Sequence, residues 1–549
     1  MFMRLDFQPG VDVERTPTTM RGGWVDSNLV RVREGKYEKH LGWQRIINVP
    51  LQGKARGIHY WTDLQAIPWL AIGTNQRLYV INLAQLPGGT SPVTLPLPAF
   101  SLSIITPTGW TGGQVDQVSG NFATPLIWSL DNFGQDLLAW PSGGKFYYWQ
   151  PPATNPSGAW PIAQPVLNTG PHPPSGAVGA NPDPPTYNLG GFTAMPQQIV
   201  FAYGCLPYST TVPYPSSNVP NPLQIRWSDQ QDFTQWAPTA SNQAGGYIIP
   251  RGSRIIGALS SILGNFFWTD LDFWSAQYSG FPLVFGFQNI GPNTGLLARQ
   301  AAVATGNAIF WASDHGFFLF GGGGPQPIPC TLWDQFYNNI VHGQQEKVVA
   351  GTDQHHNEVY FFFPSIAGNP GPSSNSNAEI DSYLKYNFVE NVWDFGSATP
   401  AMANLLSRTC WTDQNRPGGP FSVDLNGLVQ QSDIGVDADG VAMTGVSLTS
   451  GYYDVDEGQG MMFVDQLVPD FLWNQSTVPN PSLQMTLLFR NWPGDEPTVK
   501  GPFKITPQTK YVTCRCRGRE VAVKIECDSP GTWFRMGTPR LRASRDGRL

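Results

Sequence analysis

The residues of this chain that could bind a metal or carry out catalysis are few and scattered. Two of the seven histidines, His355 and His356, are adjacent, and Cys514, Cys516 and Cys527 lie near the C-terminus. Adjacent side chains on a strand point to opposite faces, so the two histidines could share a metal only in a turn. Three thiolates without a fourth ligand fall short of a structural zinc site. We therefore predict no metal site and no cofactor, and expect reduced, buried cysteines.

Carboxylates give an equally weak signal for catalysis. The run Asp437-Ala438-Asp439-Gly440 resembles the start of a calcium loop but lacks the third oxygen ligand and the distant glutamate, which favours an acidic turn. A glycosidase needs two carboxylates a few ångströms apart. The candidates for such a pair are Asp229, Asp270 and Asp314. All three recur in similar local sequences, so a structural role in the repeated turns explains them better than catalysis does. Motifs of serine hydrolases, phosphate loops, dinucleotide folds and zinc proteases are absent. We predict a protein that is not an enzyme.

A recurring tripeptide, Trp-Ser/Thr-Asp, is the strongest pattern in the sequence. Its copies are Trp61-Thr62-Asp63, Trp227-Ser228-Asp229, Trp268-Thr269-Asp270 and Trp411-Thr412-Asp413, with looser versions beginning at Trp128 and Trp311. Two consecutive steps, 227 to 268 and 268 to 311, match the length of one four-stranded propeller blade. An indole can wedge between blades, while the Ser/Thr and Asp side chains turn the chain. Coincidence in a Trp-rich chain is the alternative to a β-propeller.

The composition indicates a neutral, aromatic surface rich in turns. Charged residues make up 13% of the 549, aromatic residues another 13%, and there are 59 Gly and 50 Pro. The charged share is about half of that in a typical soluble domain. Such a surface suits a subunit of an assembly better than a freely diffusing enzyme. The six cysteines are too few for a disulfide framework.

Charge is distributed unevenly along the chain. Residues 501–549 carry a net +7, so the remaining 500 residues carry −14 of the total of −7. This asymmetry favours docking of the basic end to an acidic partner or to a second copy of the chain. A solvated basic edge strand is the alternative. The candidate docking residues are Arg515, Arg517, Arg540, Arg542, Arg545 and Arg548.

Three regions are predicted within a mainly β chain. Residues 1–57 read as an extended arm that packs on or closes the ring, and residues 58–435 as the propeller. A Pro-rich insertion with eleven prolines interrupts the propeller at 150–193, where regular sheet is not possible. Residues 436–549 are predicted to form an antiparallel sandwich or barrel with one basic face and a hairpin around Gly518.

Helices and membrane spans are almost absent from the predicted elements. The one expected helix is a turn or two near 331–340, where apolar side chains share a face. No run approaches the roughly 18 apolar residues of a membrane span, and no basic-then-apolar leader follows Met1. We therefore expect a protein without a membrane span that is made in the cytoplasm.

Much of the first 400 residues resembles a family of tailed-bacteriophage structural proteins, the hub or nozzle proteins of short tails that also occur as packaged-DNA stabilisation proteins. The matching segments are Ile225–Asp229 with Phe233 and Trp236, Arg251–Gly257, Phe267–Asp270, Tyr278, Phe281–Phe287, Gly291–Gly295, Phe310-Trp311, Gly316–Phe318 and Glu379–Trp393, together with Gly22–Arg31 and Gly42-Trp43. Residues 150–190 and the C-terminal region fit the pattern least.

The resemblance implies a homohexameric ring below the portal and its adaptor, in contact with tail fibre, spike or needle proteins. Such a ring forms a channel that retains packaged double-stranded DNA and later conducts it without sequence specificity. An acidic body fits this role, because few Lys/Arg contacts would bind the passing phosphates. The implied location is the tail of the virion, assembled in the host cytoplasm. The alternative is a receptor-binding or glycan-cleaving propeller of a tail fibre or spike.

Overall fold

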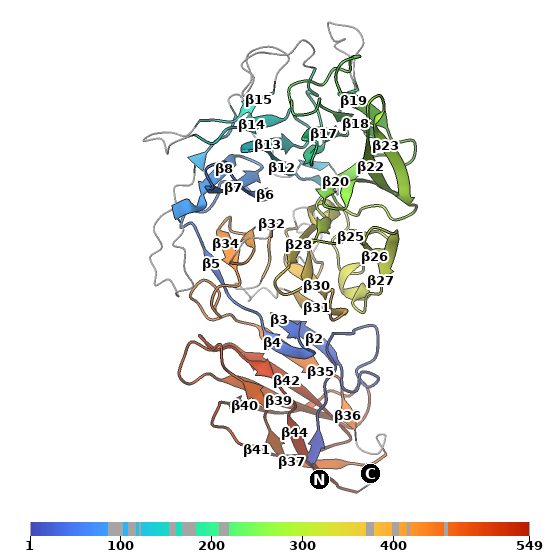
Figure 1. Cartoon of the computed structure of the whole chain (residues 1–549). Coiled ribbons are helices and arrows are strands. Elements are labelled where there is room, and N and C mark those ends of the chain that lie inside the picture. The colour runs from blue at the N-terminus through green and yellow to red at the C-terminus, as the bar shows by residue number, and fades with distance from the viewer. Residues whose placement is uncertain are drawn as a thin grey trace.

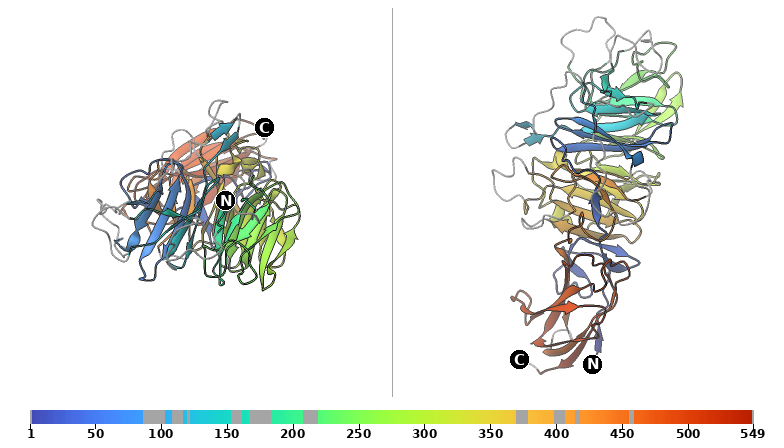
Figure 2. Two further views of the ribbon diagram at one scale, coloured as in Figure 1. Left: turned by 90° about the horizontal axis from the view of Figure 1, so that it is seen from above. Right: turned by 90° about the vertical axis from the view of Figure 1, so that its left-hand side faces the viewer.

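The chain forms an elongated molecule with a β-propeller at one end and a smaller β module at the other (Figure 1). This computed structural model describes residues 2–85, 103–107, 117–119, 122–152, 161–166, 183–207, 219–368, 378–397, 406–413, 418–454 and 459–547. Both termini lie at the far end of the smaller module, and the side view in Figure 2 shows the two parts stacked along one axis.

Within the described residues, seven four-stranded antiparallel sheets form the blades of the propeller. The first blade consists of β6 (Ala55–Thr62), β7 (Pro68–Thr74), β8 (Leu78–Asn82) and β9 (Ser103–Ile104). The second consists of β12 (Trp128–Phe133), β13 (Asp136–Pro141), β14 (Tyr147–Trp149) and β15 (Gln164–Pro165). The third consists of β16 (Gly190–Ala194), β17 (Ile199–Tyr203), β18 (Gln224–Trp227) and β19 (Gly245–Ile248). A two-stranded ribbon, β10 (Gln117–Ser119) and β11 (Phe122–Thr124), lies between the first two blades in sequence.

The remaining four blades continue in chain order. The fourth blade consists of β20 (Ile255–Ser261), β21 (Gly264–Thr269), β22 (Phe273–Gly280) and β23 (Val284–Gly291), and the fifth of β24 (Ala302–Ala304), β25 (Ile309–Ser313), β26 (Gly316–Phe320) and β27 (Pro325–Ile328). The sixth consists of β28 (Val349–Asp353), β29 (Glu358–Phe363), β30 (Ser382–Asn387) and β31 (Val392–Ser397). The seventh consists of β32 (Cys410–Thr412), β33 (Phe421–Val423), β34 (Val429–Ser432) and β5 (Trp43–Arg45). The mainly β propeller predicted from the sequence is confirmed.

The ring closes through a strand from the opposite end of the sequence. The first strand of each blade lies beside the first strand of the next, and β32 of the seventh blade returns to β6 of the first. The outermost strand of the seventh blade is β5, which pairs with β34 in an antiparallel register. Separating the first and last blades would therefore break the hydrogen bonds of one sheet, so the N-terminal segment fastens the ring.

Large aromatic side chains separate neighbouring blades at positions where the preceding blade carries glycine. A Cβ on Gly57 or Gly73 of the first blade would lie 2.7 or 2.3 Å from atoms of Trp128 in the second. A Cβ on Gly351 of the sixth blade would lie 2.5 Å from Trp411 in the seventh. Both indoles are buried, and each donates its N–H to a carbonyl of the preceding blade. These tryptophans are wedges between blades, as the sequence predicts.

The smaller module is a two-sheet sandwich to which both ends of the chain contribute. One sheet runs β1 (Phe2–Arg4), β44 (Arg540–Arg545), β37 (Met462–Val468) and β41 (Val512–Gly518). The other contains β2 (Trp24–Asn28), β35 (Val446–Ser450), β42 (Glu520–Cys527), β39 (Leu483–Arg490) and β40 (Thr498–Ile505), with β36 (Tyr453–Asp454) beside β42. Buried side chains of both sheets, such as Val464, Leu541, Met485 and Val523, belong to one apolar cluster.

The prediction of a hairpin around Gly518 is wrong. Strand β41 pairs with β37, whereas β42 pairs with β35 and β39, so the chain crosses at Gly518 from one sheet of the sandwich to the other. Alternating apolar residues are present in both strands because both line the same core, from opposite sides. Periodicity shows which residues face a core but not which strand is the partner.

The N-terminal arm predicted over residues 1–57 does not form one structural unit. Strands β1 and β2 belong to the two sheets of the sandwich, and β5 completes the seventh blade. Between them, β3 (Val30–Arg33) and β4 (Lys36–Lys39) form a hairpin, hereafter the linking hairpin, which continues into a small sheet with β43 (Arg535–Met536) and β38 (Phe471–Leu472). The linking hairpin lies between the two modules in Figure 1, with β3 beside β31 of the sixth blade. The N-terminal segment thus ties the propeller to the sandwich.

Helical structure is confined to short turns among the described residues. They comprise α1 (Trp333–Phe336), at the predicted position, and the 3-10 turns η1 (Leu83–Gln85) and η2 (Gln345–Lys347). In this part of the chain, no helix has the length and apolar character to cross a membrane. Most of the predicted Pro-rich insertion, over 153–160 and 167–182, lies outside the described residues.

Candidate functional site

The Trp-Ser/Thr-Asp copies are structural, and most of them are not equivalent positions of a repeat. Trp268 and Trp311 both lie on the second strand of their blades, β21 and β25, and are true counterparts. Trp61 and Trp411 lie on first strands, whereas Trp227 lies on the third strand β18. The step of 41 residues from 227 to 268 therefore does not correspond to one blade.

The four aspartates of these copies fix turns and loops through hydrogen bonds. Asp63 accepts the N–H groups of Gln65 and Ile67 and the indole N–H of Trp69. Asp229 accepts from the backbone of Gln230 and Gln243, Asp270 from the backbone and hydroxyl of Ser253, and Asp413 from the backbone of Gln354. None of Asp229, Asp270 and Asp314 lines the cavity at the propeller axis, so the structure does not bring the three glycosidase candidates together there.

The predicted docking arginines lie on the first sheet of the sandwich, and part of their charge is neutralised. Arg540 and Arg542 alternate with buried residues on β44, and Arg515 and Arg517 are exposed on β41. Arg542 forms a two-pronged pair with Asp465, at 2.7 and 2.6 Å, and Arg517 pairs with Asp546 at 2.9 Å. Within the described residues, Arg515 and Arg540 form no ion pair. Arg545 is exposed on β44, and Arg548 lies outside the described residues.

A cavity of about 610 Å³ occupies the centre of the propeller, lined by the first strands of all seven blades. Its polar wall includes His59 and Asp131, with Nε2 of His59 lying 4.0 Å from Oδ1 of Asp131. Burial lowers the pKa of His59 and raises that of Asp131. Asp131 also accepts the backbone N–H of Thr193 in the next blade at 2.7 Å, so it fixes the contact between two blades. The volume is that of a pocket for a small ligand.

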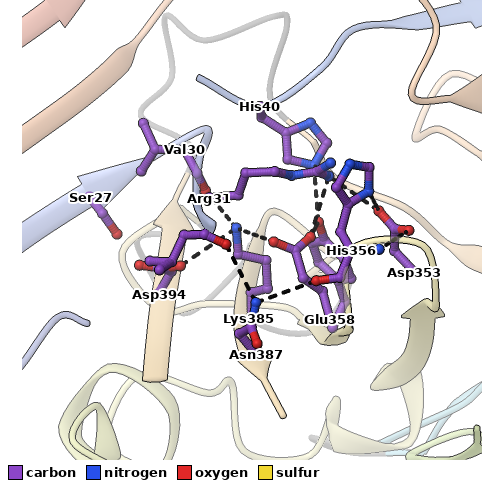
Figure 3. A network of polar contacts seen from close by, with 12 residues as sticks. Ser27, Val30, Arg31, His40, Asp353, His356, Glu358, Lys385, Asn387 and Asp394 are labelled. Atoms are coloured by element: carbon purple, nitrogen blue, oxygen red, sulfur yellow. Dashed lines mark hydrogen bonds and ion pairs between the residues drawn. The ribbon is translucent and has the colours of Figure 1, made fainter. Parts of the chain in front are cut away.

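The most unusual site is a buried cluster of charges where the linking hairpin meets the last two blades (Figure 3). Its fully buried cations are Arg31 of β3 and Lys385 of β30. Its carboxylates are Asp353, Glu358, Asp394 and Asp433, contributed by β28, β29, β31 and the residue after β34. We call these six residues the junction cluster.

Arg31 is the centre of the junction cluster. Its Nη2 lies 3.2 Å from Asp353, 3.3 Å from Glu358 and 3.2 Å from Asp433. The same nitrogen lies 2.9 Å from Nε2 of His40, whose Nδ1 donates to the carbonyl of Leu41. His40 is therefore neutral and accepts from Arg31. Burial and then the charge of Arg31 hold the pKa of His40 well below its ordinary value, which agrees with this assignment.

Lys385 connects the sixth blade to the linking hairpin. Its Nζ donates to the carbonyl of Val30 at 2.6 Å and lies 3.2 Å from Glu358 and 3.6 Å from Asp394. Asp394 in turn accepts the hydroxyl of Tyr37 on β4. Burial alone would raise the pKa of Glu358, but Arg31 and Lys385 outweigh burial and lower it. The propeller and the hairpin are thus joined by charges held away from water.

Sequence reasoning missed the junction cluster, although a signal was present. In a chain with 13% charged residues, Arg31 lies between two valines, and Lys385 lies within Tyr383-Leu384-Lys385-Tyr386. Both interrupt strands that otherwise read as fully buried. A charge at such a position requires a buried partner. The identity of the partner was not accessible, since Arg31 and Asp353 are 322 positions apart.

Within the described residues, the cysteine and acidic-turn candidates from the sequence are not assembled into metal sites. Cys514 and Cys527 are buried on different sheets of the sandwich and Cys516 is half-buried; all six cysteines are unpaired. Asp437 accepts the N–H of Gly531, and Asp439 pairs with Arg45, as expected of an acidic turn. His355 and His356 do lie in a turn, between β28 and β29, and only His356 faces two carboxylates.

Comparison with known proteins adds no family. No family model and no curated protein matches the chain. Among solved structures, the chain is similar to the WD40 domain of Neurospora crassa Pan2, with 9% identity, coverage of 73% of this chain and 97% of that one, and a TM-score of 0.36. It is also similar to a virginiamycin B lyase from Staphylococcus aureus, with 10% identity, 71% and 98% coverage, and a TM-score of 0.34. Similarities this low carry no argument about function, and the propeller assignment rests on the sheet topology.

Proposed function

We propose that this protein is a structural subunit of a short bacteriophage tail, acting in a hub or nozzle ring below the portal and its adaptor. The observation that carries the proposal is the path of the N-terminal segment. It supplies strands to both sheets of the sandwich, anchors the linking hairpin by buried charges and closes the seventh blade. A chain built in this way resists separation of its two modules, as a subunit under the pressure of packaged DNA must.

The segments that carry the sequence resemblance lie on the propeller blades and on the N-terminal strands. Those from Ile225 to Trp393 fall on the third to sixth blades, and Gly22–Arg31 falls on β2 and the first half of the linking hairpin. In this proposal six copies enclose the DNA channel between them, because the cavity inside each propeller has the size of a small-ligand pocket. The acidic body of net charge −14 would face the DNA, where few cations bind its phosphates.

The exposed arginines of the sandwich are proposed to dock on an acidic surface of the adaptor, or of a fibre, spike or needle protein. Arg515 and Arg540 carry this role best, because neither forms an ion pair within the described part of the chain. Rim charges of this kind set the orientation and rate of association more than its final strength.

Stoichiometry tests the proposal. The purified full-length chain, alone and mixed with the portal–adaptor complex of the same virus, is examined by electron microscopy and sedimentation at several salt concentrations. We expect a six-fold ring with an axial hole in at least one of the two samples. A trimer, or a monomer that the adaptor leaves unchanged, contradicts the proposal. The double variant Arg515→Glu/Arg540→Glu should slow docking, whereas Arg77→Glu, at an exposed site on the propeller, should not.

A glycan-binding or glycan-cleaving propeller is the second candidate, favoured by the axial cavity and its His59–Asp131 pair. Binding of a host saccharide to the isolated protein, lost in Asp131→Asn, would support it. Release of sugar from host polysaccharide would identify the cleaving form. Under that function the protein is expected to be trimeric, as fibres and spikes typically are, so the same stoichiometry separates the two candidates.

A further inference from the structure

Three potential metal ligands converge at the edge of the junction cluster. Asp353 ends β28, His356 lies in the turn that follows, and Asp433 follows β34 of the seventh blade. Nδ1 of His356 lies 2.7 Å from Oδ2 of Asp353 and 3.6 Å from Oδ2 of Asp433. One donor atom from each residue lies within 4.8 Å of the other two. The three come from two blades, so the fold and not a local motif brings them together.

The carboxylate of Asp433 is buried without hydrogen-bond donors. Its side chain is 9% exposed, and neither carboxylate oxygen accepts a hydrogen bond. Oδ1 faces Arg31 at 3.2 Å, whereas Oδ2 faces the His356 ring at 3.6 Å. A buried carboxylate oxygen normally has hydrogen-bond donors around it, because its desolvation is otherwise uncompensated. Oδ2 of Asp433 therefore faces the His356 ring without a hydrogen-bond donor of its own.

The net charge of the junction cluster also favours a bound cation. Four buried carboxylates face two buried cations, and His40 is neutral by its hydrogen bonds. With all four carboxylates ionised the cluster would carry a surplus of −2, but burial raises the pKa values of Asp353, Asp394 and Asp433, that of Asp433 to about 7, so bound protons offset part of this charge. The hydroxyls of Tyr37 and Tyr360 donate hydrogen bonds to Asp394 and Glu358 and add no positive charge, and the carboxylate of Asp413 lies close enough to repel those of Asp353 and Asp433. A single divalent cation would neutralise the surplus.

We propose that Asp353, His356 and Asp433 bind one divalent transition-metal ion of the Zn²⁺ type. An imidazole with two carboxylates suits zinc and similar ions, whereas Mg²⁺ and Ca²⁺ prefer ligand sets made only of oxygen. Ligand atoms bound to tetrahedral zinc at about 2.1 Å lie about 3.4 Å apart. The 3.6 Å between His356 and Asp433 matches this spacing. The 2.7 Å between His356 and Asp353 is that of a hydrogen bond, which opens when the metal replaces the shared proton.

The histidine needs only a change of tautomer to act as a ligand. The Nδ1–H of His356 donates to Oδ2 of Asp353 at 2.7 Å. The ring can carry its one proton on Nε2 and offer Nδ1 to the ion. Asp353 is already oriented, because its Oδ1 accepts the backbone N–H of His356 at 3.2 Å. A water molecule would complete a four-coordinate site.

The ion would connect the sixth blade to the seventh beside the linking hairpin. Asp353 and His356 belong to the sixth blade, Asp433 follows the last strand of the seventh, and Arg31 of the hairpin touches both carboxylates. Metal binding is therefore expected to stabilise closure of the ring. An ion that binds only the folded state stabilises it in proportion to the logarithm of its concentration over its dissociation constant.

Metal binding is measured on the full-length protein after dialysis against EDTA. Calorimetric titration with Zn²⁺ should give one site per chain, and Co²⁺ should give the visible absorption of a four-coordinate complex. Mg²⁺ in large excess should not compete. Thermal unfolding should shift upward with Zn²⁺. A wild-type protein that binds no Zn²⁺ at this stoichiometry would overturn the proposal.

Paired variants locate the site. His356→Asn should weaken Zn²⁺ binding by about 100-fold or more, since loss of a ligand costs at least as much as loss of its supporting partner. His355→Asn is the matched control, because the adjacent ring is exposed and should leave binding unchanged. Asp433→Asn is the second test should His356→Asn fail to fold, and it removes a surplus buried charge. Equal binding by wild type and a folded His356→Asn or Asp433→Asn protein would contradict the assignment.

Discussion

Lys385 offers the sharpest test of how the propeller is fastened to the rest of the chain. Its ammonium group is fully buried, donates to the carbonyl of Val30 at 2.6 Å and lies within 3.6 Å of Glu358 and Asp394. Replacing it with methionine keeps the length of the side chain but leaves two buried carboxylates and one carbonyl without their cation. We expect Lys385→Met to lose about 3–5 kcal/mol of unfolding free energy, the range for breaking one side of a buried ion pair.

The second half of the test removes one of the stranded carboxylates. In Lys385→Met/Asp394→Asn the surplus charge is smaller, so the double variant should lose less than the sum of the single losses. A coupling energy of about 1–3 kcal/mol is expected for groups in direct contact. Lys510→Met, at an exposed position, serves as the control and should change stability by less than about 0.5 kcal/mol.

The assay is urea unfolding in EDTA, followed by tryptophan fluorescence and circular dichroism. Both probes report unfolding of the whole chain, which has 20 Trp, so the loss is measured as a shift of the unfolding transition. Limited proteolysis gives an independent reading, with faster cleavage between β4 and β5 in Lys385→Met. A loss of unfolding free energy below about 1 kcal/mol, or strictly additive single losses, would refute the inference that the buried ion pairs of the junction cluster stabilise the fold.

Three further outcomes follow from the packing. Gly351→Ala should cost about 1–3 kcal/mol, because its Cβ would lie 2.5 Å from Trp411, whereas Gly306→Ala, with open space around it, should cost little in the same denaturation assay. Burial raises the pKa of Asp136 from 3.8 to about 6 in the folded protein. The protonated carboxyl therefore favours the folded state at low pH, and this contribution to the free energy of unfolding is lost as the pH rises through about 6. Asp136→Asn should therefore be more stable than wild type at pH 8 by about 1–2 kcal/mol, an advantage that a series of urea titrations would find absent at pH 4. Burial raises the thiol pKa of Cys205 to about 12, so mass spectrometry should find it unalkylated by iodoacetamide in the native protein and alkylated in urea; rapid native labelling would contradict its burial.

The strand content and many strand positions could be predicted from the sequence alone. Stretches such as Val359–Phe363 and Leu78–Ile81 are apolar, β-branched or aromatic, and they form buried strands. Such patterns are local, because a strand's side chains alternate or are buried regardless of which strand pairs with it. The same reasoning failed for the hairpin at Gly518, because pairing is not a local property.

Similar tripeptides were misleading as markers of blade position for a related reason. A tryptophan followed by Ser/Thr and Asp stabilises many turns after a strand, and Trp61, Trp227 and Trp268 occur on first, third and second strands of their blades. The local sequence determined the turn. Its place in the blade depended on the lengths of the connecting loops and on which strands paired.

The class of fold follows from local sequence patterns: a mainly β chain with aromatic blades, and a C-terminal sandwich predicted to carry one basic face. The closure of the ring by β5 and the contacts of Arg31 with Asp353 and Asp433 arise from the arrangement of the whole chain in space. Charges on separate strands give no mutual signal along the chain, because their interaction exists only after folding has removed water from between them. Local periodicity reports burial, whereas the partner of a buried charge is a property of the whole fold.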